Sequence, residues 1–172
     1  MIRITDKKEN YKPIIKDYRG ITISFDIERF VVINETADKV ETDNYTWSVH
    51  TFTRKVSFNQ VKTFILDEIN KRVDEAILSG FKWKDMPVWL SSENQFNYKA
   101  AYDLAFQTNG ASLPTVFKFG TTEEPVYYKF DTLEELTDFY TKALTYINEQ
   151  LAIGWAKKDA IDWSEYEKAL NL

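Results

Sequence analysis

Two pairs of adjacent carboxylates, Glu123-Glu124 and Glu134-Glu135, are the residues of this chain best suited to acid–base chemistry. Hydrolysis by paired carboxylates needs two acids that face one bond from opposite sides. Adjacent residues on a helix point in different directions, so neither pair is expected to act on one substrate. We interpret them as solvated loop and helix-start residues. A carboxylate-dependent hydrolase is therefore kept only as a second alternative for the function.

Other catalytic chemistry has few candidate residues. The chain has no cysteine, which excludes disulfides, thiolate nucleophiles and cysteine metal sites. His50 is the only histidine, and its neighbours alternate as on the polar face of a strand. The polar residues Asp43, Asn44, Asp103 and Asn109 match no calcium-binding loop and are interpreted as capping and turn residues. We predict no catalytic residue, no cofactor and no metal site, and hence a protein that is not an enzyme.

Aromatic residues make up 16% of the 172 residues. That is more than a core of this size must hold, so we expect some of them on a surface that contacts a partner. The candidate partner-binding residues are Phe30, Tyr45, Trp47, Trp83 and Trp89. The alternative is that these rings are large core residues with polar tips, because such side chains are usually mostly buried.

The charge of the chain limits its partners. The net charge is −5 and the pI is near 5.0, which oppose nucleic-acid binding, although residues 1–20 are locally basic. This basic segment either is a solvated arm or binds an anionic partner. No run of about 18 apolar residues exists, so we expect no membrane insertion and a soluble protein made in the cytoplasm.

Residues 1–58 are predicted to form a β-rich segment with a basic arm. Apolar residues alternate with polar ones over 21–33 and again over 45–58, with a polar connector between them. The alternation changes phase near Glu28-Arg29, which predicts a bulge. The segment is expected to form two or three antiparallel strands.

Residues 59–172 are predicted to form an α+β domain, in which three main helices pack on a small antiparallel sheet. Apolar residues spaced three and four apart predict helices over 59–79, 92–108 and 132–153. Ser57 and Ser91 are placed to cap the first two, and Gly154 is expected to end the third. The sheet is expected to contain strands within 81–90, 114–120 and 125–130, and a short terminal helix is expected to start at Ser164 and reach Leu170.

Several junctions of this second part resemble a known family. The motifs are Gly80-Phe81, Val88-Trp89-Leu90, Glu93-Asn94-Gln95-Phe96-Asn97-Tyr98, Phe117-Lys118-Phe119-Gly120 and the helix with Leu136, Tyr140 and Ile147. Over about residues 68–163 the chain resembles an uncharacterised domain family of phage and prophage proteins, commonly encoded near tail-fibre and tail-assembly genes. Where members often have a glycine in the hairpin, this chain has Lys84-Asp85. The resemblance implies no catalytic residues.

The resemblance and the aromatic excess together indicate a non-enzymatic phage or prophage protein. We expect a structural adaptor or assembly factor that binds another tail or virion component, located in the virion or in the host bacterial cytoplasm during assembly. A homo-oligomer is compatible with this role. The alternative function is a glycan-binding module, because exposed Trp and Tyr faces also suit sugar rings.

The predicted docking place is the N-terminal sheet. Strands 21–33 and 45–58 leave at least one sheet edge that no other predicted strand covers. A strand from a partner or from a second copy could pair there, while Phe30, Tyr45 and Trp47 fill alternate pockets. The alternative is that these aromatic side chains cover helix 59–79.

Overall fold

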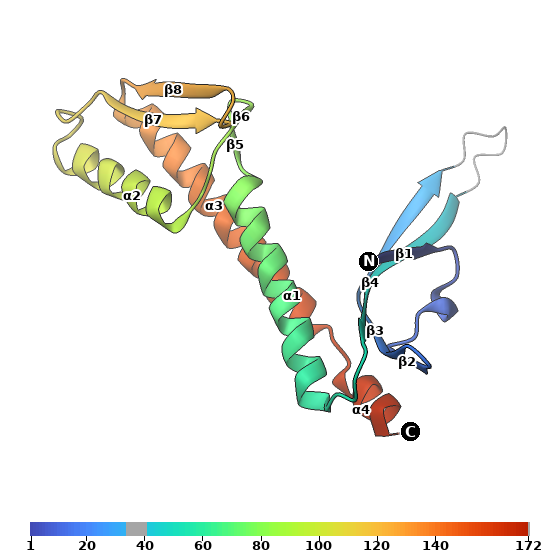
Figure 1. Ribbon diagram of the computed structural model, residues 1–172. Coiled ribbons are helices and arrows are strands. Elements are labelled where there is room, and N and C mark those ends of the chain that lie inside the picture. The colour runs from blue at the N-terminus through green and yellow to red at the C-terminus, as the bar shows by residue number, and fades with distance from the viewer. Residues whose placement is uncertain (34–40, 172) are drawn as a thin grey trace. The chain divides into compact units, whose positions relative to one another are not determined.

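The computed structural model describes residues 1–33 and 41–171 of the chain (Figure 1). The predicted α+β class is confirmed, with a four-stranded antiparallel sheet near the N-terminus, small hairpins and helices. The chain divides into two compact units, Met1–Ile69 with Lys157–Leu172, and Asn70–Ala156. This division differs from the boundary predicted after residue 58, because two long helices, α1 (Phe58–Ser79) and α3 (Leu133–Asp159), each contribute residues to both units.

The first unit contains the N-terminal sheet, whose strand order is β1-β4-β3-β2. Its strands are β1 (Ile2–Thr5), β2 (Ile14–Asp17), β3 (Gly20–Ile33) and β4 (Glu41–Phe52). The predicted bulge lies in β3, between Phe25 and Glu28, where Asp26 has a positive φ of 56°. The two carboxylates Asp26 and Glu28 both pair with Lys157, at 2.9 and 2.5 Å, which ties the bulge to the end of α3.

The long strands, which were expected to leave at least one sheet edge uncovered, are paired on their outer sides over part of their length. Residues expected to form a charged arm make short strands instead, so that β1 pairs with residues 45–48 and β2 with residues 20–23. Each is four residues long, which is too short for alternation to stand out in the sequence. The second long strand also starts earlier than predicted, at Glu41, and ends earlier, at Phe52. Ser57, which was predicted to lie within it, caps α1.

The core of the first unit joins this sheet to two helices. Its buried side chains are Ile23, Phe25, Val56, Val61, Ile65, Ile69 and Tyr166. The capping box that starts α1 is confirmed, since Gln60 N donates to Ser57 Oγ and Ser57 N to Gln60 Oε1. The terminal helix α4 (Trp163–Asn171) begins slightly earlier than predicted, and Asp162 rather than Ser164 accepts the hydrogen bonds at its start.

The second unit contains two hairpins, one whole helix and parts of α1 and α3. Its further elements are β5 (Lys82–Trp83), β6 (Met86–Pro87), α2 (Ser92–Gln107), β7 (Thr115–Gly120) and β8 (Pro125–Phe130). The predicted single sheet is wrong, because β5 pairs with β6 and β7 with β8 in two separate sheets. The β7–β8 hairpin lies beside α2 and the start of α3 (Figure 1), and Phe119, Phe130 and Phe139 fill the space between them.

Two further predictions about this unit have opposite outcomes. The tight turn without glycine between β5 and β6 is confirmed, since Lys84 and Asp85 both have positive φ, at 45° and 65°. The prediction that Gly154 ends the third helix is wrong, because α3 continues through it to Asp159. A Cβ at position 154 would lie 2.5 Å from Val73 Cγ2, so the glycine allows two helices to approach closely.

Candidate functional site

The five residues predicted to bind a partner are divided between the two units, with Phe30, Tyr45 and Trp47 in the first and Trp83 and Trp89 in the second. Trp47 and Trp83 are only 4% and 3% exposed and pack in the interiors of the first and second unit. Tyr45 is partly buried, whereas Phe30 and Trp89 are 39% and 52% exposed. Partner binding stays a prediction for the exposed residues, and Trp89 lines a pocket.

That pocket is an open cleft of about 700 Å³ in the second unit, called here the β7 cleft. It is lined by Ser79, Pro87, Val88, Trp89, Asn94, Asn97, Tyr98, residues 116–120 of β7, Thr121, Thr122 and Glu123. Its volume is within the range of ordinary ligand pockets. Aromatic rings form part of its apolar lining: Tyr98 packs against Phe117 and Phe119, with ring centroids 4.6 and 6.3 Å apart. Burial raises the pKa of the Tyr98 hydroxyl to about 12.

Trp89 is held outward by the chain around it. Its neighbours Val88 and Leu90 are buried, and their amides donate to Phe81 O and Leu78 O, each at 2.9 Å. Ser91 caps α2, and the side chain of Asn94, in the first turn of this helix, donates to the Trp89 carbonyl at 2.8 Å. The alternation of buried and exposed residues, together with the helix cap, therefore fixes an exposed indole at the side of the cleft.

The cleft offers hydrogen-bonding groups but few groups for acid–base chemistry. Among the described residues that line it, Glu123 alone carries a carboxylate. The hydrolase alternative requires two acids in one pocket. The amides of Asn94 and Asn97 and the hydroxyls of Thr121 and Thr122 can donate and accept hydrogen bonds. This composition suits recognition of a polar backbone or ring over an apolar floor.

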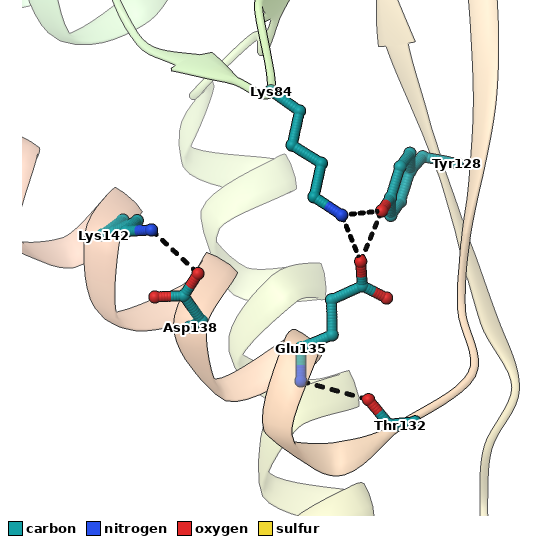
Figure 2. Close-up of polar contacts among 6 residues, drawn as sticks. All are labelled: Lys84, Tyr128, Thr132, Glu135, Asp138 and Lys142. Atoms are coloured by element: carbon teal, nitrogen blue, oxygen red, sulfur yellow. Dashed lines mark hydrogen bonds and ion pairs between the residues drawn. The ribbon is translucent and has the colours of Figure 1, made fainter.

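A second polar cluster in the same unit was not predicted. Lys84 Nζ donates to Glu135 Oε1 at 2.5 Å and to Tyr128 Oη at 2.6 Å, and these contacts are drawn as dashed lines in Figure 2. The Tyr128 hydroxyl in turn donates to Glu135 Oε1 at 2.5 Å, and Glu135 N donates to Thr132 Oγ1. These residues come from the β5–β6 turn, from β8 and from the first turn of α3. No sequence spacing relates them, so only the fold reveals the cluster.

The electrostatics of this cluster indicate a structural role. The hydrogen bond to Glu135 raises the pKa of Lys84 to about 12, and the hydrogen bond from Lys84 lowers the pKa of the Glu135 carboxyl. Both shifts hold the groups in their charged forms near neutral pH. A general acid or base instead needs a pKa near the working pH. The cluster therefore acts as a clamp between the β5–β6 hairpin and the start of α3.

The remaining sequence candidates also have structural surroundings. The ring centroid of His50 lies 4.1 Å from that of Phe64 and 4.6 Å from that of Phe52. The prediction that His50 lies on the polar face of a strand is therefore wrong. Arg29 pairs with Asp43, and Lys99 with Asp103. Over the described ranges 1–33 and 41–171, no three metal-ligating side chains gather at one place. No helix there is long and apolar enough to cross a membrane.

A family model described as a domain of unknown function, DUF4376, matches residues 60–171, which include the whole β7 cleft. No curated protein and no solved structure matches this chain.

Proposed function

We propose that this chain, which belongs to the DUF4376 family of domains of unknown function, is a non-enzymatic structural adaptor or assembly factor that docks another protein in its β7 cleft. The observation that carries the proposal is the exposed Trp89 beside this cleft. The partner is a tail or virion component of a phage or prophage, as the sequence resemblance implies. The protein then acts in the virion or in the host bacterial cytoplasm during assembly.

The cleft has the composition of a protein-docking site. Binding energy at protein interfaces concentrates in a few aromatic or arginine side chains surrounded by less important contacts. Trp89 is 52% exposed, and the amide and hydroxyl side chains of the cleft surround its apolar floor. Covering such a ring gains hydrophobic free energy, while the polar rim can satisfy the partner's hydrogen-bonding groups.

The test is a binding measurement with purified phage tail proteins. Trp89→Ala is expected to weaken the complex at least about 30-fold, the loss typical of a central interface tryptophan. Trp155→Ala is the matched control, because Trp155 is 60% exposed on α3 and lies outside the cleft lining. Equal losses in both variants, or no binding by any of these tail proteins, would contradict the proposal.

A glycan-binding module is the second candidate function. An indole face beside the amides of Asn94 and Asn97 suits a sugar ring, which stacks its apolar face on an aromatic ring and bonds through its hydroxyls. A glycan array probed with the wild type and Trp89→Ala separates the two functions. A glycan signal that depends on Trp89, without binding to the tail proteins, would favour this second candidate.

A further inference from the structure

The strand that borders the β7 cleft has one unpaired edge. β7 pairs with β8 through residues 115–120 and 125–130, and in the part of the chain that the structure describes no other strand joins this sheet. In a two-stranded antiparallel sheet, half of each strand's backbone N–H and C=O groups point away from the partner strand. Such an edge is a template for one more strand.

The hydrogen bonding at the turn of the β7–β8 hairpin determines which backbone groups of β7 point toward β8 and which point away from it. Thr121 N donates to Glu124 O, and the next pair, Gly120 with Pro125, cannot exchange two hydrogen bonds because proline has no N–H. Hydrogen-bonded and non-hydrogen-bonded pairs alternate along an antiparallel ladder. Phe119 and Phe117 therefore bond to β8, whereas the backbone groups of Gly120, Lys118 and Val116 point to the free edge.

The cleft runs along this free edge. Its lining includes all five consecutive residues from Val116 to Gly120. Side chains of a strand alternate between its two faces, so a pocket on one face would contact every second residue only. Lining by both sets fits a cleft that follows the strand's edge, to which the outward backbone groups of Val116 and Lys118 point.

The side chains on the two faces specify what such a ligand carries. On one face Phe117 and Phe119, with Tyr98, are apolar and at least partly buried. On the other face Lys118 is exposed and, among the described residues, has no carboxylate partner. A strand added to this edge would place its alternate residues beside these two faces. Apolar side chains fit beside the rings and a carboxylate fits beside Lys118.

Resting on the proposed adaptor function, we infer that the partner is held through an extended peptide segment, which adds a strand to the free edge of β7. The segment has apolar side chains at alternate positions toward the cleft floor and an acidic side chain beside Lys118. Main-chain hydrogen bonds then provide attachment, and the side-chain pockets provide selectivity. The segment needs about five or six residues to span the edge, the common length of a strand.

The test uses the full chain and peptides selected on it from a random linear library of about eight residues, a little longer than a typical strand. Amide exchange is measured on the wild type with and without a selected peptide. Exchange at Val116 and Lys118 is expected to slow at least about 10-fold, with little change at Phe117 and Phe119, which already bond to β8. A peptide that binds without slowing these two amides, or a library that yields no binder, would overturn the inference.

A pair of variants checks the same point through affinity. Lys118→Pro removes an outward N–H of β7 and leaves the ladder bonds to β8, because the Lys118–Tyr127 pair is of the non-bonded type. Lys129→Pro makes the matching change on the outer edge of β8, since Lys129 pairs with Val116. The peptide is expected to bind Lys118→Pro at least about 10-fold more weakly and Lys129→Pro as tightly as the wild type. If purified tail proteins bind Lys118→Pro as well as wild type, the adaptor function stands and strand addition is wrong.

Discussion

Glu135 joins three segments of the second unit through one carboxylate oxygen. Lys84 comes from the turn between β5 and β6, and Tyr128 comes from β8. The sequence identifies Glu135 only as an acid near a helix start, which Thr132 caps. Its partners could not be predicted, because they lie 51 and 7 residues away and are brought together by hairpins whose pairing depends on the whole unit.

The Glu135 clamp makes stability depend on pH in a specific direction. The folded pKa of Glu135 lies below its ordinary value, so its contribution is complete above the pKa of the unfolded chain, about 4.3, and is lost as the pH falls through the folded pKa. Glu135→Gln is expected to lower the melting temperature by roughly 1–4 °C at neutral pH, because the pair is partly solvated. The difference should shrink toward zero as the pH falls through the folded pKa of Glu135.

Glu134→Gln is the control for this measurement. Glu134 lies in the same first turn of α3 but is exposed, so its loss affects the helix dipole without breaking the clamp. Thermal melts of both variants across pH decide the point. An equal effect of the two substitutions, or a Glu135→Gln effect that grows as the pH falls, would contradict the structural role of the clamp.

At the level of elements, helix starts could be predicted better than helix ends or strand partners. Ser57 and Ser91 carry their capping bonds within three residues, and these local signals are visible in the sequence. The prediction at Gly154 failed because a glycine in this position can either end a helix or allow another helix to approach closely. Only the position of the neighbouring helix distinguishes the two cases. The strand patterns predicted the strands of both hairpins but not that the hairpins form two separate sheets. Alternation shows which face of a strand is buried and not which strands pair.

The close approach at Gly154 predicts a coupled effect of two substitutions. Gly154→Ala is expected to destabilise the fold by about 1–3 kcal/mol, because the new Cβ meets a methyl group of the rigid Val73 side chain. In a Val73→Ala background the same change should cost less than about 1 kcal/mol, since the clash is removed and alanine favours a helix over glycine. Denaturant unfolding of the four proteins gives the coupling. Identical costs in both backgrounds would show that the contact does not constrain α3.

At the scale of the whole molecule, the docking place depends on facts that the sequence alone does not contain. The aromatic excess indicated a binding surface, yet most rings of the second unit fill its core, with Trp83 and Phe139 in edge-to-face contact. The N-terminal sheet was expected to offer the free edge, but β1 and β2 cover part of it. The free edge of β7 follows from the pairing of the hairpin and could not be predicted from side-chain patterns.

The most direct test of docking in the β7 cleft is hydrogen–deuterium exchange of the full chain, alone and in complex with a tail protein that binds it. We expect slower exchange in residues 87–98 and 115–123, which hold the cleft lining apart from Ser79. Residues 2–5 and 14–33, in the N-terminal sheet, should not change. Protection confined to the N-terminal strands, with the cleft exchanging as in the free protein, would contradict docking in the β7 cleft.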